Sequence, residues 1–197
     1  VPPDMMWVKN RTRSLGGGSD WFVYVRGITY LNVYGSDPDN YGDNPAALEL
    51  NNTDQANFSM SGVWDHTHPT STHFRVGDTF ATNENGSSMQ ALLFASIEGI
   101  SKIGYYAGNG NADRELNFGF RPKFFLHKRV DGGGAWSVYD EVLGLDSNGV
   151  FNRKLRLDTN GSQTTVNHFH QIATGVRIQD VSGYNANGEV YIYYAHS

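Results

Sequence analysis

Hydrophobic residues along the chain gather in short runs that are rich in aromatic and β-branched side chains. Gly, Pro, Asn or Asp bounds each run, a pattern typical of β-strands separated by turns. The runs predict strands at residues 5–8, 21–25, 28–33, 123–126 and 190–194. The shorter apolar stretch at residues 46–50 fits either a strand or one helical turn, and no long amphipathic helix is predicted.

Five Asn-Gly steps supply glycines for turns in which the backbone needs a positive φ. They lie at residues 85–86, 109–110, 148–149, 160–161 and 187–188. Such frequent turn chemistry predicts many short antiparallel strands joined by tight hairpins.

The second half of the chain repeats the pattern of the first half in the same order. Residues 3–11 (PDMMWVKNR) correspond to residues 122–129 (PKFFLHKR). In each copy three glycines follow, at residues 16–18 and 132–134, as the expected tip of a hairpin that leads into a Trp-x-x-Tyr strand. Two later pairs of segments also correspond, residues 48–51 with 155–158 and residues 92–96 with 192–196.

This correspondence predicts the internal organisation of the chain. Repeat one spans about residues 3–96, a connecting strand and turn occupy residues 97–121, and repeat two spans residues 122–197. The first copy is longer, because it carries insertions at residues 35–45 and 53–69. Insertions of this kind are expected in surface loops, where variation and recognition concentrate.

Each copy alone holds about half the strands of a large sandwich and would expose one apolar sheet face. We therefore predict that the two copies close on each other to form a single β-sandwich domain over residues 1–197. Its two antiparallel sheets would pack face to face. The predicted core includes Trp7, Trp21, Phe94, Phe124, Trp136 and Ile192.

Composition narrows the classes of partner. The net charge of −5 provides no broad basic surface for a polyphosphate, so nucleic acid is not an expected partner. The longest apolar stretches are far shorter than the roughly 20 residues of a membrane-spanning helix, so no membrane insertion is expected. Cysteine is absent, so neither a disulfide nor a thiolate metal site is available.

Several motifs in order resemble a concanavalin A-like (laminin-G-like) domain family that occurs in virion proteins of marine bacteriophages. They are Trp-Val-Lys-Asn-Arg at residues 7–11, Trp-x-x-Tyr, Gly-Ile-Ser-Lys-Ile-Gly-Tyr-Tyr-x-Gly-Asn-Gly at residues 99–110, Gly-Phe-Arg-Pro-Lys-Phe at residues 119–124 and the closing Tyr-Ile-Tyr-Tyr-Ala. The resemblance spans residues 6–195. It implies a jelly-roll sandwich located on the surface of a virus particle, as a head decoration or in a tail fibre or other appendage.

Catalytic arrangements are not apparent in the sequence. A glycoside hydrolase needs two carboxylates about 5–10 Å apart across the scissile bond. Asp140 and Glu141 are adjacent, so on a strand their side chains would point to opposite faces. We therefore predict a protein that is not an enzyme.

Two histidine pairs could in principle chelate a transition metal, because His-x-His on a strand puts both imidazoles on one face. The pairs are His66 with His68, near His73, and His168 with His170. We interpret both pairs as polar, solvated strand or loop residues, and no metal cofactor is predicted at them. Metal binding stays the alternative if the two pairs meet in space.

The acidic segment at residues 37–44 partly resembles a calcium loop, with Asp37, Asp39 and Asp43 at alternate positions. It lacks an oxygen-bearing residue at the fifth position and the distal Glu of such loops. We interpret it as an Asp/Asn turn, with a structural or glycan-bridging calcium ion as the alternative.

Two functions remain. In the first, the domain is a virion structural protein, held in a homo-oligomer or on the capsid by contacts with other virion proteins. In the second, it is a lectin-like adhesin module that recognises a host surface glycan. Exposed aromatic residues would then stack on sugar rings, and the candidates are Tyr34, Tyr41, Trp64 and Tyr184.

Overall fold

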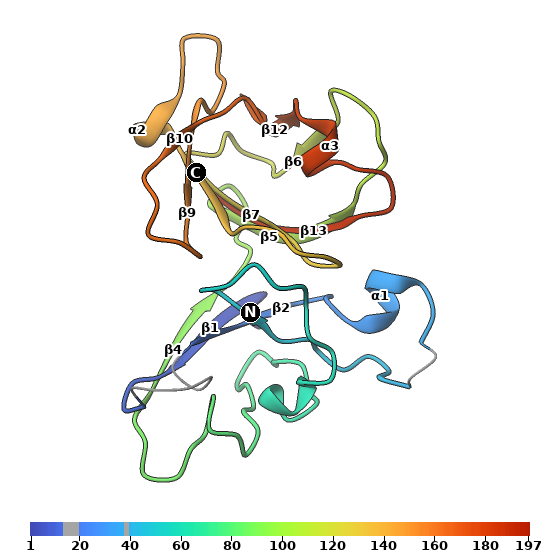
Figure 1. Ribbon diagram of the computed structural model, residues 1–197, viewed down its shortest axis with the longest axis vertical. Helices are drawn as coiled ribbons and strands as arrows, with labels where there is room; N and C mark the ends of the chain where they lie inside the picture. The colour runs from blue at the N-terminus through green and yellow to red at the C-terminus, as the bar shows by residue number, and fades with distance from the viewer. Residues whose placement is uncertain (14–19, 38–39) are drawn as a thin grey trace. The chain divides into compact units, whose positions relative to one another are not determined.

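The computed structural model describes residues 1–13, 20–37 and 40–197. Within these residues the chain divides into two compact units, Val1–Ala95 (unit 1) and Ser96–Ser197 (unit 2). The described strands form three antiparallel sheets, and the helices between them are short (Figure 1). The prediction of an antiparallel all-β fold is therefore confirmed, although there are three sheets rather than two.

Unit 1 contains a four-stranded sheet in the order β3-β2-β1-β4. Its strands are β1 (Met5–Asn10), β2 (Trp21–Val25), β3 (Leu48–Glu49) and β4 (Met89–Phe94). In the central strand β1, Trp7 lies opposite Val23 of β2 and opposite Leu92 of β4. The glycine tip predicted at residues 16–18, between β1 and β2, lies outside the described residues.

The core of unit 1 joins the sheet to irregular chain rather than to a second sheet. Met6 and Val8 of β1 and Phe22 and Tyr24 of β2 belong to one buried cluster. The same cluster contains Trp64, which ends the short 3-10 helix η1 (Ser61–Trp64). The sheet of unit 1 therefore buries apolar side chains against a loop segment of its own unit.

The strand predicted at residues 28–33 is wrong, because helix α1 (Tyr30–Tyr34) occupies most of this segment. Thr29 caps its N-terminus by accepting a hydrogen bond from the backbone N–H of Asn32. Gly35 ends it in the left-handed conformation, with φ 74°. These two terminal signals outweigh the β-branched composition of the run. Residues 46–50, which fitted a strand or a helical turn, contain β3.

Unit 2 contains a six-stranded sheet in the order β10-β9-β8-β7-β13-β5 and a three-stranded sheet in the order β11-β12-β6. The first comprises β5 (Ser101–Ala107), β7 (Phe124–Arg129), β8 (Ser137–Asp140), β9 (Arg153–Arg156), β10 (Thr164–Thr165) and β13 (Val190–His196). The second comprises β6 (Glu115–Asn117), β11 (Phe169–Ile172) and β12 (Gly175–Ile178). Two short helices are α2 (Glu141–Gly144) and α3 (Val181–Tyr184).

Aromatic side chains of the two sheets meet in the core of unit 2. The ring of Phe125, on β7, lies 4.8 Å from that of Phe169, on β11, and Tyr139, on β8, lies 5.0 Å from the same ring. Edge-to-face pairs at these separations contribute about 0.5–1.5 kcal/mol beyond area burial. Gly175 lets β12 approach β6, because a Cβ at this position would lie 1.8 Å from the carbonyl oxygen of Leu116.

The six residues predicted for the core differ in how deeply they are buried. Trp136 and Ile192 are fully buried, whereas Trp7, Trp21, Phe94 and Phe124 keep part of their surface exposed. In β1 the buried cluster takes Met6 and Val8, and the intervening Trp7 points to the other face of the sheet, where its ring lies 5.1 Å from that of Phe94.

The expected turn conformation occurs at four of the five Asn-Gly steps. Gly86, Gly110, Gly149 and Gly188 have positive φ, and Gly161 does not. The segment predicted to connect the repeats contains β5, which pairs with β13 as part of the six-stranded sheet. In the described part of the chain, no helix has the length and apolar character needed to cross a bilayer. A jelly-roll topology and a core shared by the two halves stay predictions.

Candidate functional site

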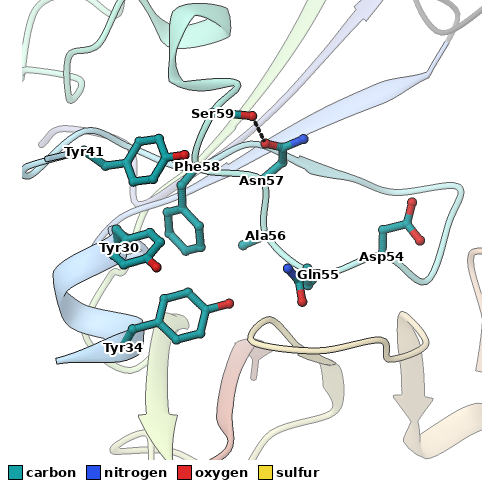
Figure 2. A pocket seen from close by; sticks show the side chains of 9 residues that line it. All are labelled: Tyr30, Tyr34, Tyr41, Asp54, Gln55, Ala56, Asn57, Phe58 and Ser59. Carbon is teal, nitrogen blue, oxygen red and sulfur yellow. Dashed lines mark hydrogen bonds between the residues drawn. The ribbon is translucent and has the colours of Figure 1, made fainter. Parts of the chain in front are cut away.

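Aromatic rings and short polar side chains line a pocket of about 380 Å³ in unit 1 (Figure 2). Its volume falls within the roughly 300–1,000 Å³ that is typical of small-ligand sites. The lining residues are Tyr30, Tyr34, Tyr41, Asp54, Gln55, Ala56, Asn57, Phe58 and Ser59.

Helix α1 supplies the first two rings. Tyr30 and Tyr34 are four residues apart, so the helix turns both side chains to the same face. Their ring centroids are 4.8 Å apart, with 50° between the ring planes. Tyr34 is the more accessible ring, with 41% of its surface exposed.

A turn in the acidic segment supplies the third ring. The carboxylate of Asp37 accepts hydrogen bonds from the backbone N–H groups of Tyr41, at 2.8 Å, and of Gly42. Asn40 and Gly42 both take left-handed backbone conformations, which Asn and Gly tolerate best. The turn brings the Tyr41 ring to 5.0 Å from Tyr30, with 30° between the planes.

Phe58 completes the aromatic side of the pocket and anchors it to the core. Its buried ring meets Tyr30 edge-on at 5.1 Å and Tyr34 at 5.7 Å. The preceding residue, Asn57, exchanges two backbone hydrogen bonds with Ala47, at 3.0 and 2.8 Å. This bridge holds the loop of residues 54–59 against the chain next to β3.

The polar side of the pocket comes from that same loop. Asp54, Gln55, Asn57 and Ser59 are exposed, and Figure 2 shows them beside the group of rings. Ser59 donates a hydrogen bond from its hydroxyl to the side-chain oxygen of Asn57, at 2.7 Å. The pocket thus presents ring faces together with amide, hydroxyl and carboxylate groups.

The structure brings together two of the four aromatic residues proposed from sequence, Tyr34 and Tyr41. Sequence reasoning missed Tyr30 and Phe58. A helical spacing of Tyr30 and Tyr34 was available as a signal, but it was hidden by the incorrect strand prediction for residues 28–33. Nothing local to Phe58 indicates that it packs beneath the other rings.

Trp64 differs from the expectation of an exposed ring, because it is fully buried. Its indole N–H donates to the carbonyl of Ala46 at 3.1 Å, and its ring meets Tyr24 edge-on at 5.9 Å. The residue belongs to the core of unit 1, so its ring offers no face to a ligand in this structure.

Tyr184 lies in unit 2, at the end of α3, and is partly exposed. Its ring packs 4.3 Å from that of His168, and its hydroxyl accepts a hydrogen bond from the Lys154 amine at 3.2 Å. Together with Arg129 and Glu189 it lines a separate pocket of about 260 Å³.

The three acidic residues proposed for calcium do not all fall within the described chain. Asp37 serves the turn described above, and Asp39 lies outside the described residues. The Asp43 side chain is 82% exposed, and its backbone oxygen accepts a hydrogen bond from His68 at 2.8 Å. In the described ranges, no group of three or more His, Asp or Glu side chains is arranged to hold a metal ion.

The histidines make hydrogen bonds with protein groups. Nδ1 of His68 lies 2.8 Å from the hydroxyl of Tyr24, and Nδ1 of His168 lies 2.8 Å from the hydroxyl of Tyr139. Burial lowers the pKa of His168 to about 4, and the nearby Lys154 ammonium adds to the effect. The His168 ring is therefore neutral near pH 7.

Comparison with protein-family models finds a match over residues 1–197 to the family described as a domain of unknown function (DUF7483). A comparison with curated proteins finds no match to this chain. A comparison with solved structures also finds none.

Proposed function

Because the chain belongs along its whole length to the DUF7483 family, whose description carries no activity, we propose a function from its own residues. The protein is a non-enzymatic carbohydrate-binding module, and its ligand binds in the aromatic pocket of unit 1. The observation that carries this proposal is the gathering of Tyr30, Tyr34 and Tyr41 beside a polar loop.

A sugar ring has an apolar C–H face and a rim of hydroxyl groups, and the pocket offers a partner to each. Aromatic side chains are apolar over the ring face, and neighbouring polar groups orient the bound molecule. Tyr34 and Tyr41 supply faces for stacking, while Gln55, Asn57 and Ser59 supply donors and acceptors for hydroxyl groups.

The composition of the lining supports binding rather than hydrolysis. Hydrolysis of a glycosidic bond generally uses two carboxylates on opposite sides of that bond. Asp54 is the single carboxylate among the nine described lining residues. The described lining therefore offers a bound glycan one carboxylate and lacks the second carboxylate that this mechanism needs.

We attribute the presence of the pocket in unit 1 to an internal repeat whose first copy carries extra loops. The strand order of the sheets supports this repeat. The order β3-β2-β1-β4 in unit 1 has a counterpart in the order β9-β8-β7-β13 within unit 2. The register agrees as well, since Trp7 lies opposite Val23 and the corresponding Leu126 lies opposite Val138. The last strands of the two copies, β4 and β13, are shifted by two residues from the sequence correspondence. Leu92, opposite Trp7, corresponds to Tyr194, opposite Leu126, and not to residue 192.

Side-chain contacts recur in the two copies, which is further support. Lys9 lies 5.8 Å from the ring centroid of Trp21, and Lys128 lies 5.5 Å from that of Trp136. Each copy also has a hydrogen bond between a tyrosine of the corresponding strand and a histidine, Tyr24 with His68 and Tyr139 with His168. Under this proposal Tyr41 and residues 54–59 fall in the two insertions of the first copy, and insertions on a rigid scaffold are common places for recognition.

We further propose that the module is displayed on a bacteriophage particle, which rests on the sequence resemblance. A surface for neighbouring subunits is available on β4, the strand at one end of the unit 1 sheet. Leu92 is 36% exposed and Leu93 is 51% exposed. Apolar side chains on an edge strand favour pairing with another chain. A phage adhesin would combine this contact with glycan binding.

Replacing Tyr34 or Tyr41 with alanine tests the carbohydrate proposal. We expect each variant to bind roughly tenfold more weakly to the glycan that a microarray of bacterial surface polysaccharides identifies, a change of about 1.4 kcal/mol. The reason is the loss of a stacking face, and isothermal titration calorimetry measures the effect.

Tyr105→Ala is the matched control, because Tyr105 is 42% exposed on β5 of unit 2 and lines none of this pocket. Release of reducing sugar ends should stay at background for all proteins. Unchanged affinity in both pocket variants would show that the sugar binds elsewhere, and absence of binding to every glycan on the array would refute the proposal.

A further inference from the structure

The charge of the aromatic pocket restricts which glycans it accepts. Of the nine lining residues, Asp54 is the one acidic residue, and none is Lys, Arg or His. Asp54 is an exposed residue of the polar loop, and Figure 2 shows it at the end of the lining that is farther from the rings. A ligand group that approaches this loop therefore meets a carboxylate and neutral polar atoms.

The Asp54 end of the pocket continues into further acidic residues. The pKa of Glu49 is raised, first by burial and then by the negative charges of Asp20 and Asp54. Side-chain amides reach this group: Asn51 donates to Asp20 at 2.7 Å, and Asn52 donates to Glu49. The three carboxylates are thus close enough to influence one another and create a negative potential beside the pocket.

Unit 1 as a whole is also negatively charged. Residues 1–95 contain ten Asp and Glu against five Lys and Arg, and residues 96–197 contain ten against ten. The complete formal charge of −5 therefore belongs to unit 1. Among its cations, Arg13, Arg26 and Arg75 form ion pairs with carboxylates outside the pocket lining.

We propose that this pocket selects uncharged glycans and excludes glycans rich in uronic acids or sulfate esters. The inference rests on the carbohydrate-binding proposal and adds the chemical class of the ligand. An acidic oligosaccharide that fills this pocket would extend its negative charges toward Asp54, and no lining residue supplies a compensating cation. Repulsion between like charges disfavours such a complex.

Matched oligosaccharides that differ only at C6 separate charge from shape. The β-1,4-linked hexamers of mannose and mannuronate form one pair, and those of glucose and glucuronate form another. We expect the intact protein to bind the neutral member of at least one pair about tenfold or more tightly than its acidic counterpart. Calorimetry at about 20 mM and again at about 500 mM salt should show this ratio shrinking as salt screens the charges.

A pair of isosteric variants assigns the effect to the pocket. Asp54→Asn should reduce the preference for the neutral hexamer severalfold, because it removes the nearest charge while keeping the size of the side chain. Asp78→Asn removes the same charge from an exposed position of unit 1 that does not line the pocket, and it should leave the ratio close to that of the parent protein.

The possible outcomes test charge selection and carbohydrate binding separately. Equal or tighter binding of the acidic hexamers overturns charge selection and leaves carbohydrate binding intact. A preference for the neutral hexamers that Asp54→Asn does not change also overturns the inference. Failure of all four hexamers to bind, at either salt concentration, counts against carbohydrate binding itself and removes the inference with it.

Discussion

The hydroxyl of Tyr24 joins the buried sheet of unit 1 to the loop that carries Tyr41. Nε2 of His68 donates to the backbone oxygen of Asp43, and its Nδ1 is hydrogen-bonded to the Tyr24 hydroxyl at 2.8 Å. Burial is the main reason that the pKa of Tyr24 is raised, and the hydroxyl stays protonated near pH 7. Through the His68 ring, one buried hydroxyl thus connects the sheet to a pocket loop.

Tyr24→Phe should lower the free energy of unfolding by about 1 kcal/mol, the usual contribution of one such hydrogen bond. It should also weaken glycan binding, because the loop next to Tyr41 loses its support. Urea denaturation and calorimetry measure the two effects. Tyr105→Phe serves as the control, since Tyr105 is an exposed tyrosine of unit 2. Unchanged stability in Tyr24→Phe would contradict this account of His68.

At the scale of elements, the strands could be predicted better than the helices. Residues 21–25 were predicted as a strand and form β2 with the same bounds, because aromatic and β-branched residues there are followed by a turn. Residues 28–33 have similar composition but form α1, which Thr29 and Gly35 delimit. Composition describes the interior of an element, whereas capping residues decide its type when the element is short.

At this scale we predict that the edge strand β4 contacts neighbouring subunits. Leu92 and Leu93 are successive residues, so their partly exposed side chains point to opposite faces of the edge strand. If β4 contacts neighbouring subunits, the parent protein should self-associate, and Leu93→Lys should shift it toward monomer because a buried lysine at the contact is unfavourable. Sedimentation velocity measures the distribution of species.

Val142→Lys is the control for added charge, since Val142 is 91% exposed in α2 of unit 2. It should leave the association of the parent protein unchanged. A parent protein that stays monomeric and does not bind phage particles would exclude β4 as an assembly surface.

At the scale of the whole molecule, two histidines of unit 2 link its stability to pH. Burial is the main cause that lowers the pKa of His127 to about 3 and that of His168 to about 4. The Tyr106 hydroxyl donates to the carbonyl of Tyr184, so His127 donates its Nε2–H to the Tyr106 oxygen. The folded chain therefore holds both rings in the neutral form.

Acidification should destabilise the protein through these groups. Below about pH 6.5 the unfolded chain protonates both histidines, whereas the folded chain leaves His168 neutral to about pH 4. The unfolded state then binds more protons, so the free energy of unfolding falls as pH falls, by about 1.4 kcal/mol per pH unit for each histidine. Stability from these groups is complete above pH 6.5.

Urea denaturation at a series of pH values tests this linkage. His168→Gln removes one of the two titrating groups, and its stability should decline less steeply between about pH 6.5 and pH 4. His73→Gln, at an exposed position of unit 1, should follow the parent protein. Equal slopes for all three proteins would show that His168 is not protected from protonation by folding.

The sequence by itself determined the antiparallel β-class and the positions of several strands, such as β1, β2, β7 and β13. Each of these depends on neighbouring residues, through hydrophobic alternation and turn chemistry. Only the tertiary structure decided which aromatic residues are accessible. Trp64 lies in a polar stretch and Tyr34 at the end of an apolar run, yet Trp64 is buried under a sheet and Tyr34 lines a pocket. Burial depends on which distant segment covers a side chain, and that information is absent from local sequence.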